Sequence, residues 1–571
     1  MQANTSKLLE AQVLETEVLV AGGGPCGLVL ANELGRRGVR CLIVDSKPGT
    51  AFNPQANATQ ARTMEHYRRH GFAQEVRSQG LPADHPTDIA YLTRFAGLEL
   101  ARLRLPTAAA APEAIKQMSG SWSAAELPHR VSQKFVEVVL REHAQSWSSI
   151  DLRYGWQLQS FHDTGHGIEA TVQPVNGASH EAVQVRAQYL VGADGARSMV
   201  RGQLGISWEG ATGFKRNFMG GRMLAVYLRA PDFYKYNPND RAWMYVVVNP
   251  QLRAFIMSVD GQGEMAFHIQ MKDDEATEAL TEADAKYWFN QAYGTAYRQA
   301  TGKDMDIDIL SMATWTAGHA LVAQRFQEGR VFLGGDAAHL FTPTGGLGYN
   351  TAVEDAVNLG WKLAHVLRGV APASLLDTYA YERKLLATRN TGYARRLADS
   401  VGLFDADPHL EDDTPEGVAA RAVADEYLNG HVRREFNIPG ITFGGRYDGS
   451  PIIVSDGTSP PVDEPNVYIP TACPGGRPPH AWLDDGTSLY DHMNFEWTLL
   501  VLGESKPSWT EPFTSAADAL GLDLKVVHQA STELQALYQA PLALIRPDQI
   551  VAWRGDGSQE ASSILRQAVG L

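Results

Sequence analysis

The stretch from Phe332 to Asn350 places an acidic side chain and several glycines between a short apolar run and a long helical pattern. Asp336 ends the apolar run, and Gly345, Gly346 and Gly348 lead into the helix. The first turn of a helix carries N–H groups without intrahelical partners and the positive end of the helix dipole. Such a turn binds negative charge, so this stretch predicts an anion-binding site.

A second glycine cluster opens an earlier helical pattern. Gly22, Gly24 and Gly27 follow an apolar run at 17–21 and form G-x-G-x-x-G in the strand-to-helix context that the motif requires. Gly22 permits a tight turn, Gly24 lets a pyrophosphate approach the backbone, and Gly27 lets the helix pack against the strand. The pattern favours dinucleotide binding over the alternative, a plain glycine-rich turn.

An acid ends the next apolar run. Residues 39–44 form a strand pattern, and Asp45 follows it, eighteen residues beyond Gly27. A carboxylate at this position can accept the hydroxyl protons of an adenosine ribose. The order strand, helix, strand and acid strengthens the dinucleotide interpretation.

Other polar groups have two open interpretations. Arg62 leads into a charged helical pattern, which is also typical of a solvated helix. Arg130 and Gln133 lie near one face of another helical pattern, where an exposed polar stripe is the alternative. Asp194-Gly195 ends an apolar strand and predicts either a dinucleotide-facing turn or an ordinary surface turn.

The composition is that of a globular protein of two or three domains, with 571 residues, 44% of them hydrophobic and 20% charged. The net charge of -15 argues against nucleic acid or an anionic membrane as the main partner and favours a small organic molecule. Cys26, Cys41 and Cys473 show neither C-x-x-C nor zinc spacing, so we expect no disulfide framework and no structural metal. We expect a cytoplasmic protein without a signal peptide or a membrane span.

The patterns change twice along the chain. Alternating apolar and aromatic residues from 206 to 310 predict a largely antiparallel sheet that can roof a pocket. The acidic, proline-bearing residues 405–415 mark a composition shift. Strand and helix patterns after this shift predict a small α/β domain.

Several motifs occur together in the chain: Gly22-x-Gly24-x-x-Gly27, Arg62-Thr63-Met64-Glu65, Gln133, Asp194-Gly195 and Gly335-Asp336-Ala337-Ala338-His339, with Pro343 and Gly348. Together they resemble the flavin-dependent aromatic monooxygenases of the para-hydroxybenzoate hydroxylase fold. The resemblance is strongest to the branch of phenol, chlorophenol and hydroxybiphenyl hydroxylases, and it covers essentially the whole chain.

The resemblance implies an α/β fold with an α+β insert. Its parts are a Rossmann-like FAD-binding domain at 1–205 and 311–400, an antiparallel-sheet substrate domain at 206–310, a linker or helical segment at 401–434 and a thioredoxin-like domain at 435–571. Residues 85–125 lie within the first range, and some of them are expected to join the substrate domain. The last domain lacks C-x-x-C, so its implied role is structural, in dimerisation.

The same resemblance implies FAD as cofactor, NADPH or NADH as co-substrate, O₂ and a small aromatic substrate, and a homodimer. Asp45 would hold the adenosine ribose, Gln133 and Asp336 the ribityl and pyrophosphate portion, and Pro343 would lie beside the isoalloxazine ring. The residues implied to bind the cofactor are Gly22, Gly24, Pro25, Gly27, Asp45, Arg62, Arg130, Gln133, Asp194, Gly195, Gly335, Asp336, Pro343, Gly346, Leu347, Gly348, Tyr349 and Asn350.

Two departures concern the nicotinamide nucleotide. Relatives often carry an arginine where this chain has Gln55, in Pro54-Gln55-Ala56, so the role of that arginine would pass to Arg62 or to another cation. The chain also has no second G-x-G-x-x-G after a strand. This pattern favours transient docking of the nicotinamide over a dedicated domain.

The implied reaction is reduction of the flavin by NAD(P)H, formation of a C4a-hydroperoxide with O₂ and attack on it by a deprotonated phenol. The flavin supplies this chemistry, while the protein excludes water and positions the ring carbon. A base or hydrogen-bond acceptor for the phenol is also required. Tyr227, Tyr245 and His268 are the candidates, each with ordinary packing as its alternative.

Two other functions remain open at this point. An FAD-dependent dehydrogenase or oxidase on the same fold would work without oxygen insertion. A ligand-binding or assembly protein with a vestigial nucleotide fold is the remaining alternative, because a fold by itself does not determine function.

Overall fold

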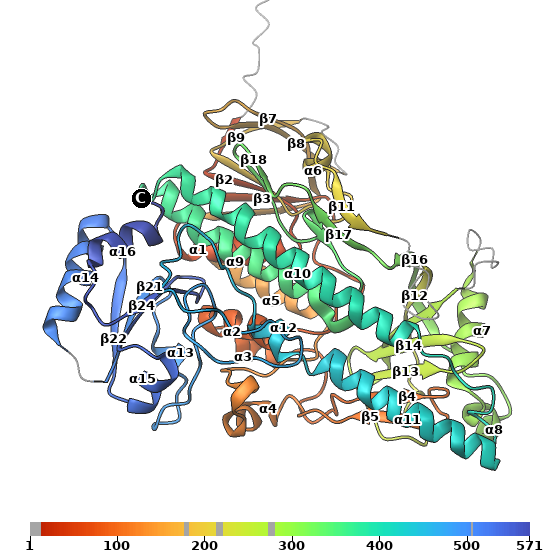
Figure 1. Ribbon diagram of the computed structural model, residues 1–571. Coiled ribbons are helices and arrows are strands. Elements are labelled where there is room, and N and C mark those ends of the chain that lie inside the picture. The colour runs from red at the N-terminus through yellow and green to blue at the C-terminus, as the bar shows by residue number, and fades with distance from the viewer. Residues whose placement is uncertain (1–12, 176–181, 213–220, 272–279, 504–505) are drawn as a thin grey trace, which may run out of the picture.

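The structure is a computed structural model that describes residues 13–175, 182–212, 221–271, 280–503 and 506–571. Its mixed α/β architecture, with an inserted sheet and a C-terminal α/β domain, confirms the predicted fold class (Figure 1).

The central element is a six-stranded sheet in the order β18-β19-β10-β2-β3-β6. It is parallel from β19 to β6, and β2, β10 and β19 are buried along their whole length. Parallel strands covered on both faces are continuous apolar runs, which explains why these segments lack alternation. The strands are β2 (Val18–Ala21), β3 (Cys41–Asp45), β6 (Ile150–Tyr154), β10 (Tyr189–Gly192), β18 (Gln327–Glu328) and β19 (Val331–Leu333).

Helices α1 (Pro25–Arg36), α5 (Gln133–Ser146) and α9 (Leu347–Leu367) pack together beside this sheet, and the long α10 (Asp377–Gly402) lies along α9 (Figure 1). Because α1 follows β2 and α9 follows β19, the N-termini of both helices lie at the carboxyl ends of the parallel strands. This edge of a parallel sheet is where α/β proteins bind ligands.

Two smaller sheets flank the central one. One has the order β1-β9-β8-β7 and the other the order β11-β17-β20. Their strands are β1 (Val13–Glu15), β7 (Trp156–Asp163), β8 (Ile168–Pro174), β9 (Val183–Ala187), β11 (Trp208–Ala211), β17 (Ala320–Ala323) and β20 (His339–Leu340).

The inserted sheet has seven strands in the order β16-β12-β15-β14-β13-β4-β5. Strands β4 and β5 come from the part of 85–125 that the sequence left between two domains, and β16 extends beyond the predicted boundary at 310. The strands are β4 (Ile89–Leu92), β5 (Glu99–Leu103), β12 (Gly221–Arg229), β13 (Met244–Val248), β14 (Arg253–Ser258), β15 (Glu264–Gln270) and β16 (Asp308–Ala317).

Both faces of the inserted sheet are covered. The outer face packs on α7 (Glu282–Tyr293), and the inner face packs on α11 (Pro415–Phe436) and on the end of α10. Figure 1 shows α11 crossing this sheet beside β5. The segment predicted as a linker or helical region at 401–434 is therefore largely one helix that closes the inner face.

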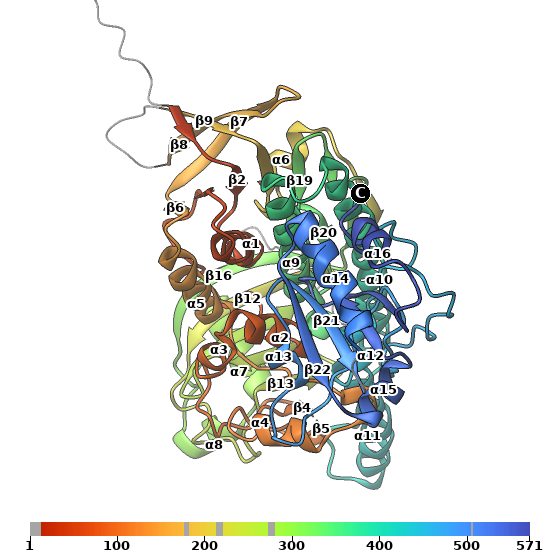
Figure 2. The same cartoon turned by 90° about the vertical axis from the view of Figure 1, so that its left-hand side faces the viewer.

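The C-terminal domain is built on the sheet β22-β21-β23-β24. Figures 1 and 2 place it at the end of the molecule opposite α7, against α9 and α2. The Trp497 ring of β21 meets Trp361 of α9 edge to face at 5.7 Å, and Cys473 is buried with a free thiol. Its elements are β21 (Trp497–Leu502), β22 (Leu524–Gln529), β23 (Leu542–Ile545), β24 (Val551–Gly555), α13 (Leu489–His492), α14 (Pro507–Leu520), α15 (Thr532–Tyr538) and α16 (Ala561–Ala568).

Short helices complete the described chain: α2 (Ala61–His70), α3 (Ala73–Arg77), α4 (Ala111–Ala114), α6 (Met199–Gln203), α8 (Ala296–Thr301) and α12 (Pro439–Phe443). Within the described ranges, no helix has the length and apolarity needed to cross a membrane. The same residues contain no group of three or more His, Cys, Asp or Glu side chains placed to hold a metal ion.

Candidate functional site

The two turns at the carboxyl ends of β2 and β10 lie in direct contact. A Cβ on Gly22 would lie 2.1 Å from the Ala193 carbonyl oxygen, and one on Gly27 would lie 2.0 Å from the Gly22 carbonyl oxygen. Glycine is therefore required at both positions. A Cβ on Gly24 would meet no described atom within 4 Å, so its backbone borders open space. Pro25 begins α1 there, and no described side chain caps the helix.

Asp45 lies beside this turn at the end of β3. One carboxylate oxygen accepts a hydrogen bond from the Gly23 N–H at 2.7 Å, and the other accepts from the Lys47 N–H at 2.8 Å. A carboxylate has about four acceptor positions. Asp45 therefore keeps the capacity to accept hydrogen bonds from the hydroxyl groups of a ligand.

Asp336 lies in the turn after β19. Its side chain is open to solvent, yet protein surrounds it. This burial raises the pKa of Asp336, although the charges of His339 and Lys47 oppose the rise. The Asp336 carboxyl group is therefore accessible to a ligand, although nearby protein atoms desolvate it.

A buried carboxylate of α9 holds this turn in place. Asp355 accepts hydrogen bonds from the Gly335 N–H at 3.0 Å and from Arg383 Nε at 2.7 Å, and it pairs with His339 Nε2 at 2.6 Å. Burial alone raises the pKa of Asp355, but His339 and Arg383 outweigh it and hold that pKa below its usual value. Asp355 and Arg383 were not predicted from the sequence, where each is one polar position in a helical pattern.

The turn before α9 also has an open side. Pro343 is exposed, although both of its neighbours in the chain are buried. Gly345 and Gly346 have φ angles of 70° and 63°, in the left-handed region where glycine is strongly favoured. Leu347 then begins α9 without a side-chain cap, and Gly348 is half-buried. The first N–H groups of α9 are therefore available to a ligand.

Asn350 and Tyr349 join the start of α9 to α2. The Asn350 side chain donates to the carbonyl groups of Gly346 at 2.6 Å and Ala58 at 3.0 Å, and it accepts two hydrogen bonds from the start of α2. The hydroxyl groups of Tyr349 and Tyr67 are hydrogen-bonded. Because the protein satisfies the Asn350 side chain, its role in this structure is to fix the turn.

Gln133 and Asp194 also use their side chains within the protein. Gln133 donates to Glu137 at 2.6 Å. Asp194 accepts from the Ser198 hydroxyl at 2.5 Å and from two N–H groups at the start of α6, and Gly195 follows it with a φ of 80°. The assignment of these residues to the cofactor stays a prediction.

The two predicted arginines are buried among protein partners. Arg62 donates to Glu65 at 3.0 Å and to Gln549 of the C-terminal domain at 2.9 Å. Arg130 lies over the ring of Trp243 at 4.7 Å. Arg62 therefore serves the interface between domains, and its contacts give no support to the expectation that it replaces the arginine absent at position 55.

Tyr245 is placed on the outer face of the inserted sheet. Its hydroxyl accepts a hydrogen bond from the Ala242 N–H at 2.8 Å, and its ring packs on Phe233 beneath α7. The side chains of consecutive strand residues point to opposite faces of a sheet, and this strand directs Tyr245 away from the FAD-binding part. This placement corrects the expectation that Tyr245 is a candidate base.

Tyr227 faces inward but is already paired. Its hydroxyl donates to Glu264 and accepts from Lys134 Nζ at 2.6 Å. Burial, reinforced by Glu264, raises the pKa of Tyr227 well above its usual value. Tyr227 therefore keeps its proton near neutral pH and does not act as a base in this arrangement.

His268 is the third candidate, and it lies on the inner face in an aromatic row. Its ring stacks on Phe255 at 4.6 Å and meets the edge of Trp315 at 6.0 Å. His268 Nδ1 and Trp315 Nε1 are buried and have no hydrogen-bond partner in the described part of the chain. Burial lowers the pKa of His268 to about 4, so the ring is neutral at pH 7. Trp315 was not predicted, because a tryptophan in a strand usually indicates packing.

The inner face adjoins the turn before α9. Strand β16 ends at Ala317, two residues after Trp315, and the carbonyl group of His319 accepts a hydrogen bond from the Thr342 hydroxyl at 2.9 Å. Pro343 is the next residue. His268 and Trp315 on the inner face of the sheet and the exposed Pro343 of the turn therefore lie at the same junction between domains.

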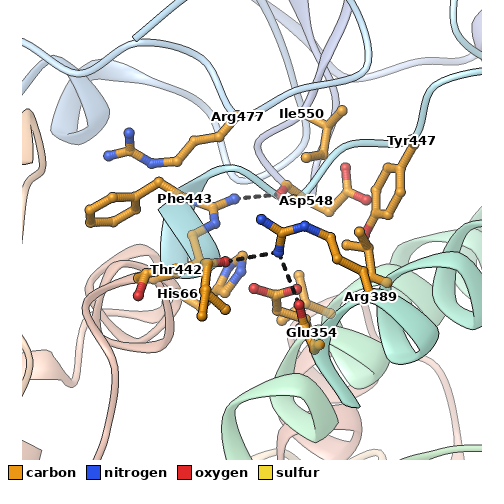
Figure 3. Close-up of a pocket in the computed structure, with 15 residues that line it drawn as sticks. His66, Glu354, Arg389, Thr442, Phe443, Tyr447, Arg477, Asp548 and Ile550 are labelled. Atoms are coloured by element: carbon orange, nitrogen blue, oxygen red, sulfur yellow. Dashed lines mark hydrogen bonds between the residues drawn. The ribbon is translucent and has the colours of Figure 1, made fainter. Parts of the chain in front are cut away.

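A separate cavity lies between α2, α12 and the C-terminal domain (Figure 3). Arg62 donates to the Asp548 carbonyl group there at 3.0 Å, and Arg389 donates to the Ile441 carbonyl group at 3.2 Å. The cavity has a volume of about 30 Å³, which is room for about two water molecules. It is too small for a flavin or an aromatic ring, so it is not the candidate active site.

The groups at these turns fit a flavin dinucleotide. Gly24 leaves space at an uncapped helix start, Asp45 and Asp336 provide acceptors, and Pro343 faces an open side of the turn before α9. Uncapped helix N-termini favour the negative charge that such a molecule carries.

Comparison with known proteins agrees with this geometry. A family model described as FAD binding domain matches residues 15–394, and one described as Aromatic-ring hydroxylase, C-terminal, matches residues 471–570. The chain is 30% identical to a phenol 2-monooxygenase of Pseudomonas sp. (strain EST1001), over 95% of this chain and 90% of that one.

Two further similarities cover nearly the whole chain. A 2,4-dichlorophenol 6-monooxygenase of Delftia acidovorans is 30% identical over 97% of both chains. The solved structure of the rebeccamycin biosynthetic enzyme RebC with reduced flavin has a TM-score of 0.84 at 32% identity, covering 98% of this chain and 100% of that one.

Proposed function

The chain belongs to the FAD-dependent aromatic-ring hydroxylases, and we propose that it transfers one oxygen atom from O₂ to a phenolic or related activated aromatic compound, with NADPH or NADH as electron donor. Two relatives are named as monooxygenases of phenols, which supports this substrate class. Their names also disfavour the alternative of dehydrogenation or oxidation without oxygen insertion.

One observation carries the proposal. The Thr342–His319 hydrogen bond joins the turn before α9 to the end of the inserted sheet, so this turn and the face that bears His268 meet at one junction. An enzyme that transfers an atom from a cofactor to a substrate needs such a junction, because the reacting atoms must be about 3–3.5 Å apart.

FAD, when bound, supplies electron transfer and oxygen activation. The β2–α1 turn at Gly24 would hold the pyrophosphate, Asp45 the ribose and Asp336 the ribityl portion. The N–H groups at the start of α9 would stabilise negative charge on the ring.

The inner face of the sheet would hold the substrate. His268 is neutral at pH 7, so its ring can accept a hydrogen bond from a phenol, and the Trp315 N–H can donate to a second oxygen. The aromatic row around them would exclude water from the reacting atoms.

Three finer points belong to the same proposal. The nicotinamide nucleotide docks transiently, because the chain has no second glycine motif after a strand. The C-terminal domain lacks C-x-x-C, so its role is structural, and it contributes to a homodimer. Three cysteines, all free in the structure, fit a cytoplasmic location.

The test is to load the purified protein with FAD and follow the consumption of NADPH, NADH and O₂ with a panel of phenols. We expect substrate-dependent consumption and a product heavier by one oxygen atom. An oxidised product without added oxygen would support the dehydrogenase or oxidase alternative, and a protein that cannot be loaded with FAD would exclude both functions.

A further inference from the structure

Helix α11 supplies a buried carboxylate to the turn before α9. The two family models match residues up to 394 and again from 471, so α11 lies outside both. Glu435, in the last turn of α11, is 7% exposed. Its Oε1 accepts a hydrogen bond from the Gly345 N–H at 3.1 Å. Helix α11, which covers the inner face of the inserted sheet, is therefore hydrogen-bonded directly to the turn before α9.

The second oxygen of Glu435 is also engaged. Glu435 Oε2 pairs with His431 Nε2 at 2.8 Å, and His431 Nδ1 lies 3.0 Å from Ser400 Oγ. An ionised carboxylate only accepts hydrogen bonds, so His431 carries a proton on Nε2. The fully buried His431 ring thus orients Glu435 toward Gly345.

Gly345 is fixed on its other side as well. Its carbonyl group accepts a hydrogen bond from Gln60 Nε2 at 2.8 Å, and the neighbouring Thr344 hydroxyl donates to the Ala394 carbonyl at 2.6 Å. Glu435 therefore completes a set of bonds that holds Gly345 in its left-handed conformation, and it adds a negative charge to that set.

A cation lies near this carboxylate without bonding to it. Arg130 is 4% exposed and lies over the rings of Trp243 at 4.7 Å and Phe436 at 5.6 Å. Its Nη1 has no hydrogen-bond partner among the described residues. Burial lowers the pKa of Arg130 to about 10, while Glu435 opposes that fall, so Arg130 stays charged at neutral pH and offsets part of the charge of Glu435.

We infer that Glu435 is a positioning residue of the cofactor site and that its charge limits the preference of the site for reduced FAD. This inference rests on the proposed placement of the flavin ring at the Pro343–Gly348 turn. The Gly345 N–H that bonds Glu435 is not available to the cofactor. A negative charge in a poorly hydrated interior also disfavours added negative charge nearby. Removal of the charge therefore favours the reduced form.

Two substitutions separate the bond from the charge. Glu435→Gln keeps an oxygen acceptor for Gly345 and removes the charge, whereas Glu435→Ala removes both. In both variants we expect the affinity for reduced FAD relative to oxidised FAD to rise about tenfold, which is about 30 mV in the two-electron potential. In the Ala variant alone, oxidised FAD should bind about fivefold more weakly, because the Gly345 turn loses a bond.

The measurements are the potential of bound FAD and the affinity of the FAD-free protein for oxidised FAD. Glu426→Gln, at an exposed position of the same helix, is the matched control and should change neither quantity. A purely structural role would weaken both FAD forms alike, so an unchanged potential in both Glu435 variants overturns the inference. If Glu435→Ala does not fold, the potential of FAD bound to the isosteric Glu435→Gln variant tests the inference by itself.

Asp336→Ala separates this outcome from failure of the cofactor placement. Loss of FAD in Asp336→Ala together with a wild-type potential in the Glu435 variants overturns only the role of Glu435. Unchanged FAD affinity in both Asp336→Ala and Glu435→Ala overturns the placement of FAD and the inference with it.

Discussion

Asp336, His268 and Asp355 are titratable side chains whose protonation depends on their surroundings more than on residue type. Burial raises the pKa of Asp336 and lowers that of His268 to about 4, whereas His339 and Arg383 overcome burial at Asp355. Each direction is the balance between desolvation, which disfavours the charged form, and the charges and hydrogen bonds nearby. These differences suit Asp336 to contact a ligand, His268 to accept a hydrogen bond as a neutral ring and Asp355 to hold the turn.

We expect Asp336→Ala to weaken FAD binding by tenfold or more, because the proposed FAD site would lose a hydrogen-bond acceptor. The ratio of flavin absorbance to protein absorbance after purification and the affinity of the FAD-free protein measure this. Asp413→Ala, at an exposed position of the chain, is the control. Unchanged flavin content in Asp336→Ala would refute the assignment.

We expect His268→Ala to lower kcat/KM for a phenolic substrate by about tenfold without loss of FAD, since the substrate loses a buried hydrogen-bond acceptor. With a pKa of about 4, His268 is neutral from pH 6 to 9 and should add no inflection near pH 6.5 to the wild-type pH profile. His528→Ala, at an exposed position, should behave like the wild type. Wild-type turnover in the His268 variant would exclude it from the reaction.

Among the elements, α9 contributes most to the site. Its first turn joins the glycine turn through Asn350, and one turn later Asp355 reaches back to the Gly335 turn after β19. Both anion-facing turns therefore depend on one helix. Arg383 of α10 holds Asp355, so the position of α10 affects the position of the Gly335 turn.

We expect Asp355→Asn to lower the free energy of unfolding by about 3–5 kcal/mol, because Arg383 loses its fully buried carboxylate partner. Urea denaturation with and without FAD measures the loss. Glu354→Gln is the matched control on the same helix. Glu354 is partly exposed and also pairs with Arg383, so we expect a change of about 1 kcal/mol or less. Equal losses in the two variants would contradict the role of Asp355.

The whole molecule is held together by buried ion pairs between the FAD-binding part and the C-terminal domain. Glu382 of α10 pairs with Arg546 at 2.8 Å, and Glu65 of α2 pairs with Arg477 at 2.5 Å. Burial raises the pKa of both carboxyl groups, but the arginines outweigh it and lower the pKa of Glu65 to about 2 and that of Glu382 well below its usual range. The two domains are therefore joined by carboxylate charges that are lost when acid protonates Glu65 and Glu382.

These pairs make domain docking sensitive to acid. A carboxyl group whose folded pKa is depressed stabilises the fold above its unfolded pKa of about 4.3, and that contribution is lost as the pH falls toward the folded value. Between pH 4.3 and 2 we expect each pair to lose about 1.4 kcal/mol of stability per pH unit. Denaturant unfolding across this window measures the slope.

Glu65→Gln is the variant for this test. It should be less stable than the wild type at pH 7, and its stability should depend less steeply on pH, because glutamine does not titrate. Glu113→Gln, which breaks the exposed pair with Lys116, should keep the wild-type slope. Parallel curves for Glu65→Gln and the wild type would show that Glu65 does not link docking to pH.

Much of the fold was predictable from local patterns. The glycine turn at Gly22, the acid at Asp45 and the glycine turn before α9 depend on backbone conformations and helix ends that neighbouring residues specify. Strands β4 and β5 were left between two domains because their pairing partners are distant in the chain. Asp355, Arg383, Trp315 and Glu435 were missed for the same reason, since isolated polar or aromatic positions in a helix or strand do not indicate what they contact.

The sequence by itself determined the fold class, the dinucleotide-type glycine turn and the anion-favouring turn at Asp336, because each depends on residues close together in the chain. The tertiary structure decided which side chains act together. It placed Tyr245 on the outer face, paired Tyr227 with Glu264, left His268 and Trp315 on the inner face and brought Glu435 to Gly345. The physical reason is that burial, sheet face and long-range hydrogen bonding set the chemistry of a side chain, and none of these is a property of local sequence.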